Sequence, residues 1–213
     1  MIETTTVVEK VRDFLRDQII QGELQPGDRV VQGTVADQLG VSRIPIREAI
    51  HALISEGLLN MEPHHGAVVS PVSVEMANEV FGLRAMIEPR LLKLAGEKMN
   101  KKALQAARKQ LTMMKRLSKR PEDFKEWAKC HWAFHTALYS PSEQSLTLEM
   151  VRHLMQHSER YMALEVAALS TADTDHAEHK EMLTLCEQGE FEKAAHCLSE
   201  HILRTPASIN QIS

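Results

Sequence analysis

The sequence contains little that would place the protein in a membrane or in an oxidising compartment. Its 213 residues include only three cysteines, Cys130, Cys186 and Cys197, an odd count without a Cys-x-x-Cys pair. No apolar run approaches the roughly 20 residues of a membrane-spanning helix. The first residues lack the basic-then-apolar pattern of a signal peptide. We therefore expect a cytoplasmic protein with reduced thiols and no membrane partner.

The sequence also lacks a basic excess and is poor in aromatic residues, which make up 4% of it. Residues 1–70 contain six Lys or Arg against ten Asp or Glu, and the remainder is balanced. Domains that bind nucleic acid are usually basic. Any contact with DNA must therefore depend on a local patch, which predicts modest non-specific affinity and a shallow salt dependence.

The segment from Gly40 to Ile50 is the most informative part of the chain. Arg43 and Arg47 lie four residues apart, so they project from one face of a predicted helix. Ile46 and Ile50 fall on another face, as expected for a helix that packs on a core. Such a helix suits the major groove of DNA. The alternative is an ordinary surface helix with two solvated arginines, and the flanking sequence decides between them.

Residues 1–70 carry the signals of a winged helix-turn-helix. A first helix ends at Gly22, and Pro26 and Gly27 indicate a type II turn. A short second helix, Thr34–Leu39, is followed by a third for which Ser42 is the expected N-cap. Two short alternating segments then predict the strands of a wing, over Leu58–Met61 and Ala67–Val69.

Residues 71–213 read as helical after a short linker at 70–73. Polar interruptions separate the apolar periodic segments, and the composition suits a core of Leu, Met and Ala. The expected helices are 74–98, 101–119, 122–140, 144–169, 172–188 and 190–204. The sequence thus predicts a mainly α protein, with a winged helix-turn-helix joined to a bundle of about six helices.

Two sets of motifs resemble a known family. The first unit resembles the GntR family of bacterial transcription regulators; the matching strings are Gly22-Glu23-Leu24-x-Pro26-Gly27-Asp28, Val35 to Ile50, Glu56-Gly57-Leu58 and His65-Gly66. The second unit is similar to the all-helical FCD domain of the FadR subfamily; its matches are Arg84-x-x-x-Glu88, Phe134-His135, Glu178-His179 and His201-Ile202. The resemblance implies a DNA-binding domain at 1–70 and an effector-binding and dimerisation domain at 71–213.

The resemblance implies a homodimer that binds a palindromic operator in double-stranded DNA. The third helix would enter the major groove and the wing tip would approach the minor groove. Many family members have an arginine at the start of the second helix, where this chain has Gly33, and Gln32 could substitute as a neutral donor. The implied DNA-contact residues are Gln32, Ser42, Arg43, Pro45, Arg47, His65 and Gly66.

Histidines are concentrated in the second unit, where eight of the 11 lie between residues 131 and 201. FCD domains often bind a divalent metal through Asp-x-x-x-His and two later histidines. The resemblance implies a site of His131, His135, His179 and His201, with His131 at the Asp position. Four imidazoles suit Zn²⁺ or Ni²⁺, and also Cu²⁺. Two alternatives stay open: His131 faces elsewhere and three histidines bind, or the histidines are structural.

The resemblance also implies a small effector with a carboxylate group, bound beside the metal. Arg84 and Arg160 are the candidate partners for that carboxylate, although Glu88 is an equally good structural partner for Arg84. The sequence therefore predicts an effector-responsive transcription regulator, expected to be a repressor and not an enzyme. The alternatives are a metal-dependent enzyme with an accessory DNA-binding domain, and the same regulator with a metal-free dimerisation bundle.

Overall fold

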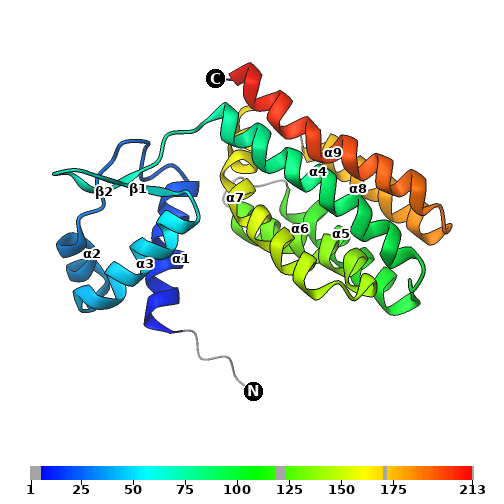
Figure 1. Cartoon of the computed structure of the whole chain (residues 1–213), viewed down its shortest axis with the longest axis horizontal. Helices are drawn as coiled ribbons and strands as arrows, with labels where there is room; N and C mark the ends of the chain where they lie inside the picture. Colours follow the sequence, from blue (N-terminus) through cyan, green and yellow to red (C-terminus); the bar gives the residue numbers. More distant parts are fainter. Residues whose placement is uncertain (1–5, 119–122, 170–171, 213) are drawn as a thin grey trace. The chain divides into compact units, whose positions relative to one another are not determined.

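The chain forms two compact units, Met1–Val72 and Ser73–Ser213. A computed structural model describes residues 6–118, 123–169 and 172–212, apart from the side chains of 166–173 and 211–212. Figure 1 shows a first unit with a small sheet and a second unit made of helices. Among the described helices, none is long and apolar enough to cross a membrane.

The first unit is a winged helix-turn-helix, as the sequence predicts. Its elements are α1 (Val7–Ile20), α2 (Gln32–Leu39), α3 (Arg43–Ser55), β1 (Leu59–Glu62) and β2 (Gly66–Val69). A capping box between Thr6 and Glu9 starts α1. Gly40 ends α2 with a φ of 65°, a left-handed conformation that glycine adopts without strain. α2 begins two residues earlier than expected, which brings Gln32 into its first turn.

The core of this unit joins α1, α3 and the wing. β1 and β2 pair antiparallel, with Leu59 opposite Val69 and Glu62 opposite Gly66. The N–H of Val30 donates to the carbonyl of Ala67 at 2.9 Å, so the segment before α2 extends the hairpin. The most buried apolar side chains come from all of these parts and include Val11, Leu15, Ile46, Ala49, Ile50, Leu53, Leu59 and Val69. This core fixes α3 against α1 and leaves its other face outward.

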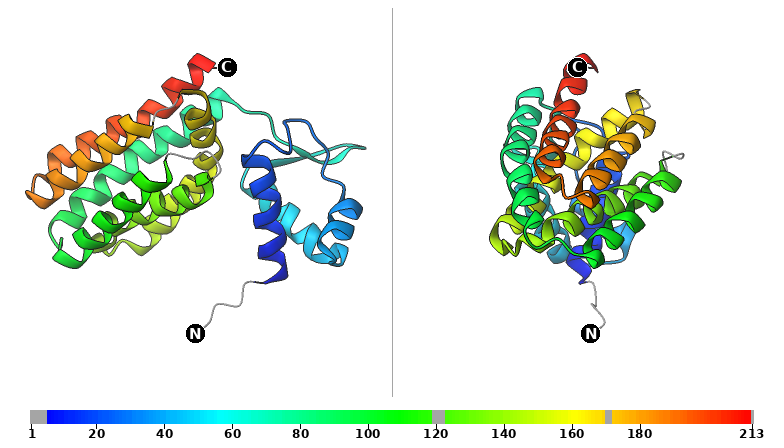
Figure 2. Two further views of the ribbon diagram at one scale, coloured as in Figure 1. Left: turned by 180° about the vertical axis from the view of Figure 1, so that it is seen from behind. Right: turned by 90° about the vertical axis from the view of Figure 1, so that its right-hand side faces the viewer.

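The second unit is a helical bundle. Its elements are α4 (Val74–Gly96), α5 (Lys101–Leu117), α6 (Phe124–Tyr139), the short 3-10 helix η2 (Ser140–Ser142), α7 (Ser145–Leu169), α8 (Ala172–Glu187) and α9 (Phe191–Ile212). α9 packs against α4, α7 and α8, and α5 packs against α6 and α8. Figure 2 shows α4, α8 and α9 lying side by side. The six predicted helices are therefore present, and apart from the end of the last one their ends differ by at most two residues.

The expected end of the last helix, at residue 204, is wrong. α9 continues to Ile212 with Pro206 inside it. Proline removes one helical hydrogen bond and usually ends or kinks a helix. Here Thr205, directly before the proline, and Ile209, three residues after it, are both buried. Their packing holds the chain helical through the proline, which sequence rules for helix ends do not anticipate.

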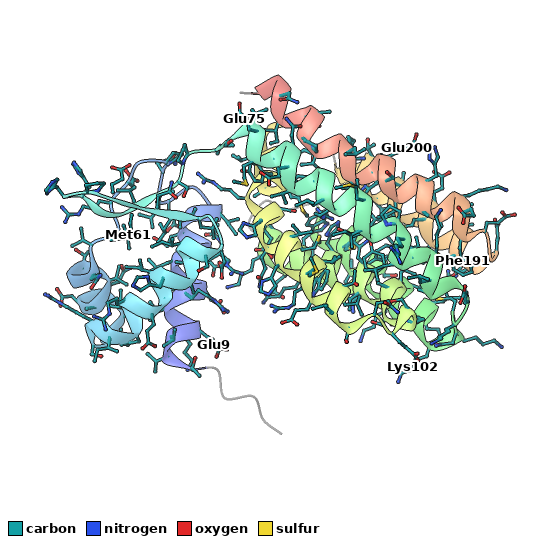
Figure 3. All side chains as sticks on the ribbon, in the orientation of Figure 1. Glu9, Met61, Glu75, Lys102, Phe191 and Glu200 are labelled. Atoms are coloured by element: carbon teal, nitrogen blue, oxygen red, sulfur yellow. The ribbon has the colours of Figure 1, made fainter. Side chains whose placement is uncertain are left out.

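Close contact between α4 and α9 requires a glycine. A Cβ on Gly96 would lie 2.6 Å from the ring of Phe191, closer than carbon atoms approach. Figure 3 shows Phe191 at the beginning of α9, beside the end of α4. The missing side chain at Gly96 therefore lets the two helices pack at this end of the bundle.

Candidate nucleic-acid interface and metal centre

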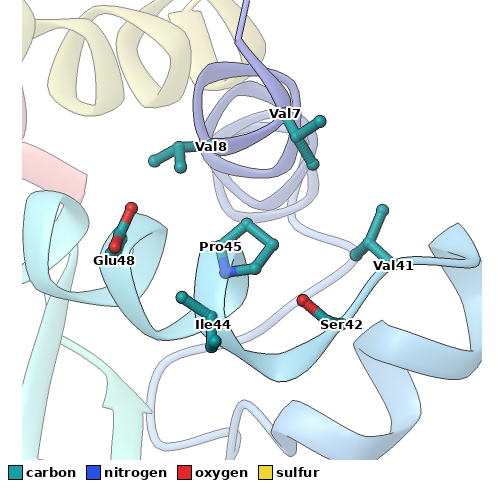
Figure 4. Close-up of a pocket in the computed structure, with 7 residues that line it drawn as sticks. All are labelled: Val7, Val8, Val41, Ser42, Ile44, Pro45 and Glu48. Carbon is teal, nitrogen blue, oxygen red and sulfur yellow. The ribbon is translucent and has the colours of Figure 1, made fainter.

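The outward face of α3 carries both predicted arginines. Ser42 is the N-cap, and its hydroxyl makes no capping hydrogen bond to α3. Arg43 and Arg47 are exposed, while Ile46 and Ile50 are buried. Figure 4 shows Ser42 at the beginning of α3, next to Pro45. The first turns of α3 thus present two guanidinium groups and a free hydroxyl, which suit base edges and phosphates.

Sequence reasoning missed two further residues on this face. Ile44 is 62% exposed, and His51 is also exposed. At about 100° per residue, positions 44, 47 and 51 fall on the same side of a helix, opposite the buried residues. The helical period could have found them, whereas the family resemblance implied only Ser42, Arg43, Pro45 and Arg47 at this end of α3.

The beginning of α2 lies close to Arg43. Gln32 is the first residue of α2, and Val31 before it provides no side-chain cap. A Cβ on Gly33 would lie 3.6 Å from Nη2 of Arg43. The guanidinium of Arg43 therefore lies beside Gly33, the position at which the resemblance would place an arginine.

The tip of the wing is exposed and tightly turned. His65 is exposed, and His64 and Gly66 have φ values of 65° and 79°. A Cβ on Gly66 would lie 4.0 Å from Nε of the exposed Arg29. Arg29 is a cation near the predicted wing contacts that sequence reasoning missed, because it comes from a distant part of the sequence.

The second unit brings the four predicted metal ligands together. His131 and His135 lie on α6, His179 on α8 and His201 on α9, and all four are buried. Their candidate ligand atoms lie within 4.8 Å of one another. Nε2 of His135 is 3.2 Å from Nε2 of both His131 and His179. Three helices therefore converge on one small space lined by ring nitrogens.

Hydrogen bonds hold three of these rings with Nε2 pointing inward. Nδ1 of His179 is 2.7 Å from the backbone carbonyl of Asp175, which can only accept. Nδ1 of His201 is 2.7 Å from Oε2 of Glu178, in the same arrangement. Because each Nδ1 donates its proton, each Nε2 is left with a lone pair for a metal.

The third ring is held through a tyrosine. The hydroxyl of Tyr139 donates to Oε2 of Glu88 at 2.7 Å, and Nδ1 of His135 lies 3.1 Å from the same hydroxyl. Since that hydroxyl has given its only proton to the carboxylate, Nδ1 of His135 is the donor to it. Burial and the adjacent Glu88 raise the pKa of Tyr139 well above its usual value, which keeps the proton in place.

His131 differs from the other three. Its Nδ1 is buried without a hydrogen-bond partner among the described residues. Its ring instead stacks on Trp127, with centroids 4.9 Å apart and planes 21° from parallel. His131 therefore has an orientation set by packing alone.

Burial favours the neutral, metal-binding form of three of these histidines, and the ring nitrogens fit a divalent metal of the later transition series. Burial, and then the neighbouring histidines, lower the pKa of His131 and His135 well below the usual value. Burial also lowers the pKa of His179 to about 4. Neutral imidazole lone pairs 3.2 Å apart repel one another unless a cation lies between them. A donor set of imidazoles suits Zn²⁺, Ni²⁺ or Cu²⁺ better than Mg²⁺ or Ca²⁺.

Of the two arginines predicted to bind the effector, Arg84 lines a cavity next to the histidines and Arg160 does not. Arg84 is buried, and its Nε donates to Oε1 of Glu88 at 2.7 Å. It lines a cavity of about 20 Å³ together with His131, His201 and Glu165, which is room for about one water molecule. Arg160 is also buried, but it is not among the residues that line this cavity.

A second cavity is also lined by His131. Its volume is about 150 Å³, and its wall includes Trp132, Met155 and Met162. Three charged residues, Lys129, Arg152 and Glu159, line it too. Of the two cavities that His131 lines, the second has room for several non-hydrogen atoms of a ligand.

The first unit is a winged helix-turn-helix with two exposed arginines on α3, and the second is a helical bundle with a buried cluster of four histidines. This combination is typical of a class of DNA-binding transcription regulators. Comparison with known sequences supports this class. The GntR family model, described as bacterial regulatory proteins, matches residues 7–69, and the FCD domain model matches residues 79–204. The chain belongs to the GntR family of regulators with an FCD domain. It is a DNA-binding transcriptional regulator and not an enzyme.

Several known proteins are similar to this chain over most of its length. A protein named "Probable D-xylose utilization operon transcriptional repressor" of Paenarthrobacter nicotinovorans is 28% identical over 93% of this chain and 86% of its own. The HTH-type transcriptional repressor GlaR of Escherichia coli is 24% identical over 93% of each chain. The solved structure of E. coli McbR/YncC has a TM-score of 0.80 at 22% identity, and covers 98% of this chain and 99% of that one. This last likeness supports the fold.

Proposed function

We propose that the protein is a homodimeric repressor that binds a palindromic operator through α3 and the wing. The observation that carries this proposal is the outward face of α3, on which Arg43 and Arg47 are both exposed over a buried apolar face. Arginine binds guanine O6 and N7 with two hydrogen bonds, which selects a sequence. Ser42 would contact a phosphate, and His65 and Gly66 would approach the adjacent minor groove.

The first unit supplies little non-specific attraction, because its acidic residues outnumber its basic ones. Specific hydrogen bonds must then provide most of the difference in affinity between the operator and other DNA. We expect Gln32 and Pro45 to assist at the edges of this interface, with Gln32 as a neutral donor from the first turn of α2. Arg29, beside the wing, is a further candidate for a phosphate contact.

We propose that the four histidines hold Zn²⁺ or Ni²⁺. The support is the convergence of their nitrogens and the hydrogen bonds that fix His135, His179 and His201. When bound, such a metal offers a Lewis-acidic position that can accept a carboxylate oxygen. The effector we propose is a small carboxylate. The chain's own contribution would be the guanidinium of Arg84, which Glu88 holds in place at the edge of the centre.

Control of DNA binding would follow from two arrangements of the dimer. An effector that binds one arrangement more tightly shifts the population toward it, and only by that difference in affinity. A coupling of about 1–3 kcal/mol changes operator affinity about 5- to 150-fold. The buried Arg84–Glu88–Tyr139–His135 connection links the centre to α4, the first helix after the DNA-binding unit.

Three measurements on the purified protein test this proposal. Selection of operators from a random duplex library should enrich one palindrome that the dimer binds. Metal analysis by mass spectrometry should find one Zn²⁺ or Ni²⁺ per chain, and small carboxylates should change affinity for the enriched palindrome. Failure to enrich any sequence would contradict the operator. A chain that takes up no metal, yet still binds the palindrome, would support the metal-free bundle instead.

A further inference from the structure

Ile44 is a large apolar side chain in an unexpected place. It lies in the first turn of α3, between Ser42 and Pro45, and is 62% exposed. The core of the unit is complete without it, because Ile46, Ala49, Ile50 and Leu53 supply the buried face of α3. A branched apolar residue gains nothing from contact with water. Its side chain is therefore available for a contact outside the first unit.

The direction of Ile44 is set by the helix. Ile44 and Arg47 are three residues apart, and such pairs are neighbours on a helix surface. Arg43 is adjacent in sequence and exposed. Figure 4 shows Ile44 on the first turn of α3, near Ser42 and Pro45. Ile44 therefore belongs to the surface that holds both arginines.

The major groove offers one apolar group to such a residue. Thymine presents its C5-methyl group there, beside its O4 acceptor, and no other standard base carries a methyl. We propose that Ile44 reads a thymine in each half-site, through contact with this methyl group, next to the guanine bound by Arg47. This inference rests on operator binding through α3 and adds to it a second, apolar determinant of sequence.

Ile44 also borders a shallow apolar groove between α1 and the beginning of α3. The groove is lined by Val7, Val8, Val41 and Pro45, with Glu48 at its end. An apolar protein segment in this groove is the rival explanation for the exposure of Ile44. Continuity with Arg43 and Arg47 favours DNA, and the experiment below separates the two.

The test removes single methyl groups from the DNA. The operator is first selected from a random duplex library with the full-length protein. Each thymine of that operator is then replaced in turn by uracil, which lacks only the C5-methyl. We expect one thymine per half-site to be sensitive, with a loss of about fourfold in affinity per methyl, the size expected when one carbon group leaves an apolar contact.

Three variants identify the residue responsible. Ile44→Ser should lose the preference for thymine over uracil at that position, and Ile44→Val, a branched apolar control, should keep most of it. Ile44→Gln should shift the selected base toward adenine, because glutamine can bind adenine N6 and N7. Since Ile44 is exposed, all three should unfold at the temperature of the unmodified protein.

Two results would overturn the inference. The first is that uracil replaces every thymine without effect, and the second is that Ile44→Ser weakens binding to the thymine and uracil operators equally. The second result would indicate that Ile44 acts through the groove and not through a base. In both cases the operator is still enriched and still depends on Arg47, so operator binding stands. If no operator is enriched at all, the proposed function fails first.

Discussion

The two sites differ in how the chain builds them. The proposed DNA interface comes mainly from one helix, α3, and its side chains point to solvent from a short continuous segment. The proposed metal centre comes from α6, α8 and α9, and its side chains are buried and held by other residues. Binding at the exposed interface therefore depends on which residues α3 presents to solvent. Binding at the buried centre depends also on the residues that hold each histidine in place.

The largest effect is expected at the exposed interface. Arg47→Ala should lower affinity for the selected operator at least about 30-fold, because each dimer loses two bidentate contacts of about 1–3 kcal/mol. Thermal unfolding should be unchanged, since Arg47 is exposed. Gel-shift titration measures the loss, and Arg116→Ala, an exposed cation of α5, is the control. An unchanged shift for Arg47→Ala would contradict the interface.

At the buried centre, the four ligands should not be equal. His179→Ala should remove most Zn²⁺ binding, because Asp175 holds that ring in the ligating orientation. His131→Ala should lower the affinity for Zn²⁺ by a smaller factor, since Nδ1 of His131 has no such partner among the described residues. Isothermal titration with Zn²⁺ measures both, and the rise in melting temperature with Zn²⁺ reports the same binding. Equal losses of Zn²⁺ affinity in the two variants would show that His131 and His179 are equivalent ligands.

Residues that support a ligand should have a smaller effect than the ligand itself. Glu178→Gln should weaken Zn²⁺ binding about 10- to 100-fold, because it weakens the hydrogen bond that Nδ1 of His201 donates to this side chain. His201 and Arg204 lower the pKa of Glu178, against the opposite effect of its burial, so the carboxylate is ionised at neutral pH. Glu181→Gln, an exposed position on the same helix, is the matched control. If Glu178→Gln and Glu181→Gln bind Zn²⁺ with the same affinity, Glu178 does not support His201 as a ligand.

The smallest effects should come from packing far from either site. Gly96→Ala should lower the free energy of unfolding by about 1–3 kcal/mol, because its Cβ would collide with Phe191. Gly82→Ala, in the same helix, has no atom within 4 Å of the new carbon and should instead stabilise by about 0.5–1 kcal/mol. Urea unfolding measures both. Destabilisation by both variants would contradict the tight contact between α4 and α9.

Local signals predicted the fold well, because helices and turns depend mainly on neighbouring residues. The hydrophobic period found α3, and glycines at 22 and 40 indicated where helices end. The end of α9 was missed, since long-range packing outweighs the proline rule at Pro206. The wing strands were placed within one residue of β1 and β2.

The centre was only partly predictable. The i,i+4 spacing of His131 and His135 suggested a shared face, and the later histidines came from the family resemblance. The same spacing relates Asp175 to His179 and His135 to Tyr139, so those supports could have been found on the helices. Glu178 and His201 lie on different helices, and no local rule predicts that they meet.

The stacking of Trp127 on His131 gives the protein a natural optical reporter. The chain has two tryptophans, Trp127 and Trp132, and the indole of Trp127 lies directly against one ring of the histidine centre. Paramagnetic ions such as Ni²⁺ and Cu²⁺ quench the emission of a nearby indole, whereas Zn²⁺ does not. The intrinsic fluorescence of this protein should therefore report which ion has entered the centre, without any added label.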